Sequence, residues 1–189
     1  DNHTFQDNLK PFGITRVAGP DIAKAKQTET TQRFKVHLIS FSEEDLYTKI
    51  EFSRRGFIGN VVIGPVDDAI LRVYKLAPIL VPHYDVSSAI AQKLHALASR
   101  AAVQARDIFD LYILSSQYAV TDTRTAAVEA HLFSRAHERV FEVEFEQFRD
   151  TVVAYLSAED QALYNRPESW EEVRLKVVRF IEEMHKPHA

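Results

Sequence analysis

Cysteine is absent from this chain of 189 residues, and its absence excludes several kinds of chemistry. Disulfides, thiol nucleophiles, cysteine-ligated zinc sites and iron–sulfur centres are all excluded. A chain without cysteine also suits a reducing compartment. No uninterrupted apolar run approaches the roughly 20 residues of a membrane-spanning helix, because Arg72 and Lys75 interrupt the longest candidate, residues 69–84. We therefore expect a cytoplasmic protein without a membrane partner.

Glycine is scarce as well, and the five glycines fit neither the P-loop nor the dinucleotide-binding fingerprint. A Gly-x-Ser-x-Gly nucleophile elbow is also missing. The eight histidines are scattered, which argues against a histidine metal site because such sites need three or four convergent ligands. The net charge of −4 argues against a chain coated in basic residues for nucleic-acid binding, but it leaves room for a local basic patch.

Polar and apolar residues alternate in two neighbouring segments, residues 33–38 and 46–53. This period is typical of half-buried strands, and a short polar connection between them predicts an antiparallel pair. We expect the apolar face, with Leu46, Ile50 and Phe52, to lie against the core. The opposite face gathers a polar set, namely Lys35, His37, Lys49 and Glu51.

The remaining pattern separates a mixed first part from a helical second part. Short elements are predicted as a helix at 4–12 ending at Gly13, a strand or connector at 61–63, a helix at 67–74 and a buried strand at 79–81. Helical periodicity follows, predicting helices near residues 90–101, 108–115, 128–136, 141–155 and 169–184. We therefore predict an α+β protein with an α/β part at residues 1–85 and a helical domain at residues 86–189.

Two further details concern the last helices. Ser169 and Glu172 have the spacing of a capping box at the start of the last helix. The aromatic residues of the last two helices are assigned to the core rather than to base stacking, and they are Phe141, Phe145, Phe148, Trp170 and Phe180.

Charged residues are dense where the first two long helices meet. Lys93 and Arg100 fall on one flank of the first helix, and Asp107 and Asp110 are three residues apart on the second. Both carboxylates therefore point to one side. Arg106 precedes Asp110 by four residues, so these two can pair, although this order of charges is the weaker one.

Two interpretations of this cluster stay open at the level of spacing. In one, Asp107 caps the second helix, and the other charges form surface salt bridges worth about 0–1 kcal/mol each. In the other, Lys93 is held against the phosphates of a nucleotide. One or both carboxylates then orient the lysine or a substrate hydroxyl.

The stretch VPHYDVSSAIAQKLHALASRAAVQARDIFDLYIL resembles the signature of the AbiEii/AbiGii-like nucleotidyltransferase toxins, which belong to the DNA polymerase β-like superfamily. That family carries a Lys followed by Ala-Leu and Arg, and then Arg-Asp-x-x-Asp-Leu-Tyr. These positions are Lys93, Ala96, Leu97, Arg100, Arg106, Asp107, Asp110, Leu111 and Tyr112. The segment KIEFSRR, residues 49–55, is similar to the family's strand with an acidic residue, here Glu51. The resemblance covers residues 33–115.

The resemblance implies a partial polymerase β-like sheet followed by a helical bundle. It implies transfer of a nucleoside monophosphate from an NTP to an RNA acceptor such as tRNA, with Mg²⁺, and control by a cognate antitoxin, as in toxin–antitoxin and phage-defence systems. Lys93, Asp107 and Asp110 would be catalytic, and Glu51 would stand near the metal. Lys93 would contact the nucleotide together with two arginines, Arg100 and Arg106.

Glu51 and the two arginines after it have simpler interpretations too. Glu51 is equally suited to pair with Lys35 or Lys49 on the same face of the strand pair. Arg54 and Arg55 could bind phosphate or an RNA backbone, or they could simply form the solvated end of the strand.

The family's Gly-Gly/Ser turn and Asp-x-Asp pair, which hold the triphosphate and Mg²⁺, do not occur in residues 1–189. We therefore expect a fragment or a degenerate relative, and the Asp1 start favours a fragment. The alternative function is a non-catalytic binding or regulatory module of a toxin–antitoxin or phage-defence system. A third interpretation is a structural domain in which the charged cluster is a salt-bridge network.

Overall fold

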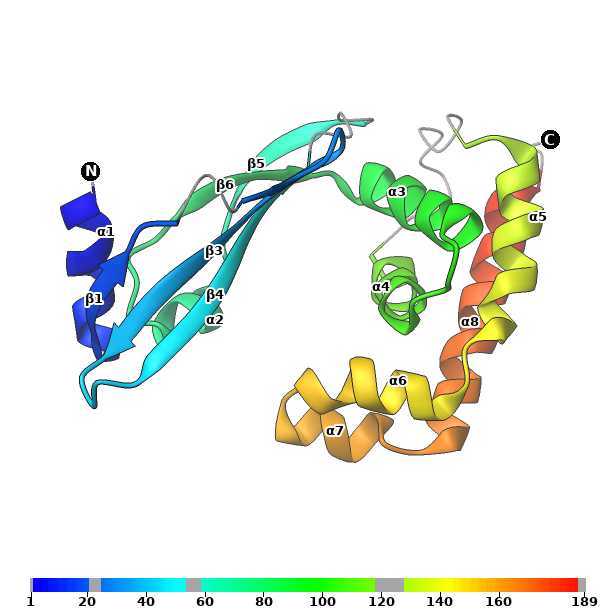
Figure 1. Ribbon diagram of the computed structural model, residues 1–189. Coiled ribbons are helices and arrows are strands. Elements are labelled where there is room, and N and C mark those ends of the chain that lie inside the picture. The colour runs from blue at the N-terminus through cyan, green and yellow to red at the C-terminus, as the bar shows by residue number, and fades with distance from the viewer. Residues whose placement is uncertain (1, 21–24, 54–58, 118–127, 187–189) are drawn as a thin grey trace. The chain divides into compact units, whose positions relative to one another are not determined.

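The computed structural model describes residues 2–20, 25–53, 59–117 and 128–186 (Figure 1). The chain forms two compact units, Asp1–Phe57 and Ile58–Ala189. Antiparallel strands come first and packed helices follow, so the predicted α+β class is confirmed. The domain boundary at residue 85 stays a prediction.

The first unit is built around one long strand. The elements are α1 (Asn2–Leu9), a 3₁₀ turn η1 (Lys10–Phe12), β1 (Ile14–Ala18), β2 (Lys26–Gln27), β3 (Thr31–Ser40) and β4 (Asp45–Ser53). The long strand is β3, which pairs antiparallel with β1, β2 and β4. As predicted, the opening helical segment ends at Gly13, whose φ of 80° is a left-handed conformation that favours glycine.

The register of β3 and β4 follows the alternation in the sequence. Phe34 lies opposite Ile50, and Lys35 lies opposite Lys49, so apolar and polar side chains occupy different faces. The prediction that the apolar face of β4 enters the core is wrong, because Ile50 is 38% exposed and Phe52 is 55% exposed. Among the described residues of this unit, only Ile14 and Val36 are buried.

The second unit opens with two paired strands, and the segment that connects them contains a short helix. β5 (Val61–Pro65) pairs antiparallel with β6 (Leu80–Tyr84), and α2 (Asp68–Val73) lies between them in the chain. Asp67 caps α2, because its Oδ1 accepts a hydrogen bond of 2.7 Å from the amide of Ala69. These three elements were predicted, but β6 extends to Tyr84, and the prediction that it is buried is wrong, because Leu80 is 70% exposed. Asp85 then caps the next helix by accepting from the amide of Ser88 at 2.8 Å.

Helices surround the main hydrophobic core of the second unit. They are α3 (Val86–Ser99), α4 (Ala105–Ser115), α5 (Ala130–Arg139), α6 (Phe145–Thr151), α7 (Ala158–Tyr164) and α8 (Pro167–His185). The largest fully buried side chain is Trp170, which stacks on Phe148 with ring centroids 4.1 Å apart. Its Nε1 donates to the carbonyl of Val143 at 3.0 Å. This core fixes α3 and α4 against α5 and α8 (Figure 1).

Two details of the helical part differ from the sequence-based expectation. The helix expected at 141–155 is divided into η4 (Val140–Glu142), α6 and η5 (Val153–Tyr155). Val143 is extended between η4 and α6 and offers its carbonyl to Trp170, and Val152 departs from helical geometry between α6 and η5. Phe141 is consequently 41% exposed. The capping box at Ser169 is not formed, since α8 begins earlier, with Pro167 in its first turn.

Within the part of the chain that the structure describes, none of the helices combines the length and the apolar character that crossing a membrane requires.

Candidate functional site

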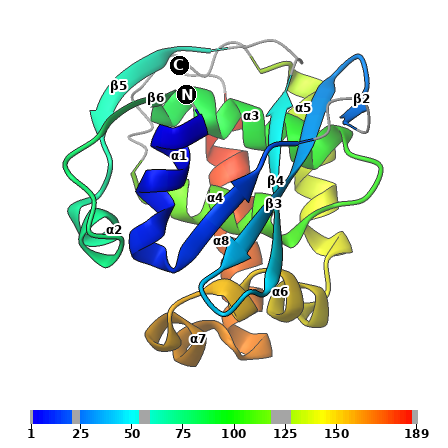
Figure 2. The same ribbon diagram turned by 60° about the vertical axis from the view of Figure 1, so that its left-hand side comes forward.

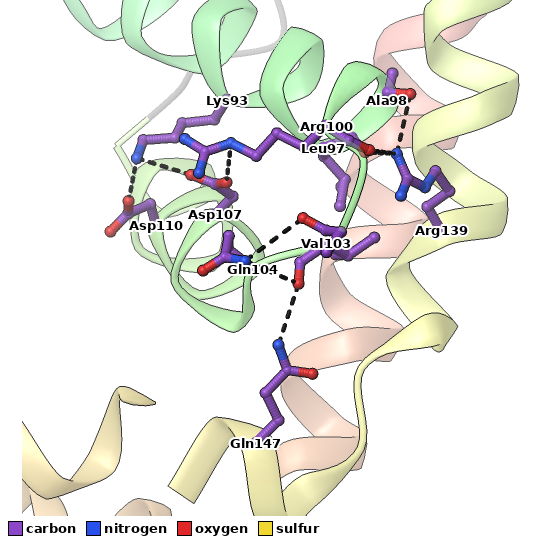
Figure 3. Close-up of polar contacts among 11 residues, drawn as sticks. Lys93, Leu97, Ala98, Arg100, Val103, Gln104, Asp107, Asp110, Arg139 and Gln147 are labelled. Atoms are coloured by element: carbon purple, nitrogen blue, oxygen red, sulfur yellow. Dashed lines mark hydrogen bonds and ion pairs between the residues drawn. The ribbon is translucent and has the colours of Figure 1, made fainter. Parts of the chain in front are cut away.

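The densest polar network of α3 and α4 is centred on Lys93 (Figure 3). From α3, its Nζ donates to Oδ1 of Asp107 at 3.2 Å and also pairs with the carboxylate of Asp110. Arg100, the residue that ends α3, places Nε 3.1 Å from Oδ2 of Asp107. The structure therefore brings together four predicted site residues: Lys93, Arg100, Asp107 and Asp110.

Helix geometry explains this convergence. Lys93 and Arg100 are seven residues apart, which is about two turns, so they share one flank of α3. Residues 100–104 then reverse the chain, and α4 returns with Asp107 in its first turn. The spacing of three residues between Asp107 and Asp110 points both carboxylates toward Lys93.

Asp107 is fully buried, with a relative exposure of 0%. The interpretation that it caps α4 is wrong, because Gln104 occupies the cap position and Asp107 lies three residues further on. Its carboxylate meets Lys93 and Arg100 instead, while its position in the first turn of α4 also favours a negative charge. A buried carboxylate needs such partners, since an unpaired buried charge is strongly destabilising.

The other three side chains are accessible to solvent. The exposed fraction is 25% for Lys93, 37% for Arg100 and 42% for Asp110. Lys93 is therefore fixed on its inner side by Asp107 but is still in contact with water. An ammonium group held in this way offers further N–H donors to an incoming anion.

Arg139 supports this arrangement from α5, and sequence reasoning missed it. The side chain is buried, and its Nη1 donates to the carbonyls of Leu97 at 3.1 Å, Ala98 at 3.2 Å and Arg100 at 2.6 Å (Figure 3). These carbonyls end α3 and have no partners within the helix. Arg139 thereby fixes the point from which Arg100 turns toward Asp107.

A second contact holds the turn between α3 and α4. The Nε2 of Gln147 in α6 donates to the carbonyl of Val103 at 3.1 Å (Figure 3). In the sequence, Arg139 lies just beyond the helix predicted at 128–136, and no local pattern there indicates partners about 40 residues earlier.

Arg106, a further candidate residue, stands apart from this network. The exposed side chain of Arg106 makes no hydrogen bond or ion pair with the residues that the structure describes, and Asp110 pairs with Lys93 in its place. Arg54 and Arg55 lie outside the described residues.

Glu51 belongs to the first unit, so its position is described within that unit alone. It forms a cross-strand ion pair with Arg33, with Oε2 2.6 Å from Nη2. The expected kind of partner, a cation on the same face, is present, but it is Arg33 rather than Lys35 or Lys49.

The Lys93 network does not fit Mg²⁺. Both nearby carboxylates already contact the ammonium of Lys93, and a divalent cation between them would lie against that positive charge. Among the described residues, no three acidic or histidine side chains converge as a metal site would require.

The model of the family "Nucleotidyl transferase AbiEii toxin, Type IV TA system" matches residues 5–183. The chain therefore belongs to this family of toxin-type nucleotidyltransferases, which act in toxin–antitoxin systems and imply an antitoxin partner. This membership confirms the resemblance that was recognised in residues 33–115. Comparison with curated proteins gave no significant match.

Proposed function

We propose that the protein transfers a nucleoside monophosphate from an NTP to an RNA acceptor such as tRNA, with Lys93 contacting the nucleotide phosphates. The observation that supports this is a solvent-accessible lysine held by a fully buried carboxylate, Asp107. In the reaction, an RNA hydroxyl oxygen attacks the α-phosphorus and a new P–O bond forms. The bond to the bridging oxygen breaks, pyrophosphate leaves, and the hydroxyl proton is released.

The side chains have different tasks in this proposal. Lys93 and Arg100 bind and orient phosphate oxygens, and Lys93 does so as a point charge. Asp107 is a positioning residue, since it is buried and acts through Lys93 and Arg100. Asp110, whose side chain is 42% exposed, would meet an acceptor hydroxyl. Arg106, which is exposed on α4, would contact the nucleotide from outside the network.

Mg²⁺ and the NTP enter this proposal through the family alone. When bound, Mg²⁺ would neutralise charge on the transferred phosphoryl group. No metal is assigned to the Lys93 network, and Glu51 remains the proposed acidic residue near a metal. The proposed setting is the cytoplasm, within a toxin–antitoxin or phage-defence system.

Incubation of the full chain with α-labelled NTPs, Mg²⁺ and total RNA tests the proposal. Label should appear in RNA with the unaltered protein, fall at least tenfold with Lys93→Met, and persist partly with Lys93→Arg, which keeps the charge. Lys186→Met at the end of α8 removes an equal charge from an exposed position and should have no effect. Equal labelling by Lys93→Met and the unaltered protein would overturn the assignment.

A second candidate is a non-catalytic nucleotide-binding or regulatory module. It is favoured by the absence of an Asp-x-Asp pair from residues 1–189 and of a metal cluster from the described residues. Equilibrium dialysis separates the two candidates. NTP binding that Lys93→Met abolishes, together with no labelling of any RNA, would support the module over the enzyme.

A further inference from the structure

One face of the first sheet carries a row of cations, which we call the basic sheet face and define as Arg16, Arg33, Lys35 and Lys49. Residues directly opposite one another in a sheet point to the same side. Lys35 lies opposite Lys49, and Arg33 follows two positions away on β3. β1 lies beside β3 (Figure 2). Arg16 lies opposite Ile39, which has the same parity as Lys35, so the register of β1 puts its cation on the same face.

The central pair of this face is unfavourable for folding. Two lysines directly across an antiparallel pair repel each other, and both are exposed. Neither forms an ion pair with a carboxylate of the described residues. The two carboxylates on this face pair with other residues of the face, because Glu51 contacts Arg33 and Asp45 contacts His37 at 2.6 Å, so neither neutralises the two lysines. We expect two like charges to be left side by side in a sheet where a bound anion neutralises them.

Aromatic contacts hold one of the two lysines in place. The Nζ of Lys35 lies 3.7 Å from the centroid of the Tyr47 ring, and the ring of His37 stacks on Tyr47 with centroids 4.7 Å apart. The Tyr47 ring is thus engaged by side chains of this chain, which disfavours base stacking. The face is suited to contacts with a phosphate backbone, which position a nucleic acid without reading its sequence.

The distribution of charge along the chain also favours binding of an anion by the first unit. The first unit contains nine Lys and Arg residues against eight Asp and Glu residues, so its net charge is +1. The whole chain carries −4, which leaves −5 on the second unit. An approaching polyanion is therefore attracted to the first unit in preference to the second.

We propose that the basic sheet face binds the sugar–phosphate backbone of single-stranded RNA, with Lys35 and Lys49 as the central phosphate contacts. The identity of the ligand as RNA rests on the proposed function, whereas the phosphate chemistry rests on the face itself. Each phosphate neutralised on a single strand contributes about 0.7 to the slope of log K against log salt. Removal of both lysines should therefore lower the slope by about 1.4 and the affinity at physiological salt roughly tenfold.

Fluorescence anisotropy of a labelled, mixed-sequence single-stranded RNA oligonucleotide tests this with the full chain. The double variant Lys35→Gln/Lys49→Gln should show the predicted losses in affinity and slope. Lys10→Gln/Lys186→Gln removes two exposed lysines from outside the face and should bind as the unaltered protein does. Lys35→Glu lowers the charge of the face by the same two units, so it should also bind RNA more weakly than the unaltered protein does. It should at the same time raise thermal stability, because it replaces a repulsive cross-strand pair with an attractive one.

The outcomes separate this proposal from the catalytic one. Loss of RNA binding in Lys35→Gln/Lys49→Gln, with binding kept in Lys93→Met, supports the basic sheet face even if no nucleotide is ever transferred. Equal RNA binding by Lys35→Gln/Lys49→Gln and the unaltered protein overturns it, whatever the transfer assay shows. Lysine-dependent binding to anionic phospholipid vesicles, without RNA binding, also overturns it.

Discussion

Replacing Lys93 and its two acidic partners singly and in pairs measures what burial adds to an ion pair. At the 3.2 Å between Nζ of Lys93 and Oδ1 of Asp107, the attraction is about 5 kcal/mol for an effective dielectric constant of about 20. Desolvation of the buried carboxylate opposes much of this attraction. We expect a coupling free energy of about 1.5–3 kcal/mol for Lys93→Met with Asp107→Asn.

Asp110 supplies the matched control, because it pairs with the same ammonium but is 42% exposed. Exposed pairs contribute about 0–1 kcal/mol, so Lys93→Met with Asp110→Asn should couple by less than about 1 kcal/mol. Salt sharpens the contrast, since screening weakens the exposed pair much more than the buried one.

Urea unfolding is the assay, followed by the fluorescence of Trp170. This is the one tryptophan of the chain, and it is 1% exposed in the core of the second unit, so its emission reports the unit that contains both pairs. A coupling free energy for Asp107 no larger than that for Asp110 would refute the argument that burial makes Asp107 the principal anchor of Lys93.

Three further predictions concern other parts of the chain. Arg139→Met should lower the free energy of unfolding, measured by urea titration, by about 2–4 kcal/mol because carbonyls at the end of α3 lose a charged donor. The control Glu142→Gln removes only a half-exposed partner of Arg139. It should lower the free energy of unfolding by less than about 1 kcal/mol. The added methyl group of Gly13→Ala meets no neighbouring atom, but the alanine must adopt a φ of 80°. The substitution should therefore lower the stability of the first unit by about 1–2 kcal/mol. Hydrogen exchange of the β1 amides should become faster, and unchanged exchange would contradict this prediction. Burial, with a hydrogen bond to Tyr112, raises the pKa of Tyr164 to about 12. Because the unfolded side chain ionises near pH 10, stability should fall between about pH 10 and 12, and Tyr164→Phe should show a smaller fall.

Local patterns predicted much of the fold and part of the site. Alternation located β3 and β4 and their polar and apolar faces, and helical periodicity located α3, α4 and α5, because both signals depend on side-chain direction along a regular backbone. The spacing of Lys93 from Arg100, and of Asp107 from Asp110, likewise placed each pair on one flank of its helix. These relationships involve residues a few positions apart, so the sequence alone determined them.

Tertiary structure decided the burial of each residue and its distant partners. Asp107 has the sequence context of a helix cap, and only the packing of α3 on α4 makes it a fully buried anchor for Lys93. Arg139 donates hydrogen bonds to carbonyls about 40 residues away. Trp170 donates to the carbonyl of Val143, at a point where the chain leaves the helix that periodicity predicted to be continuous. Such contacts depend on how separate elements meet in space, and the free energies of burial and hydrogen bonding that select them are not contained in any local pattern.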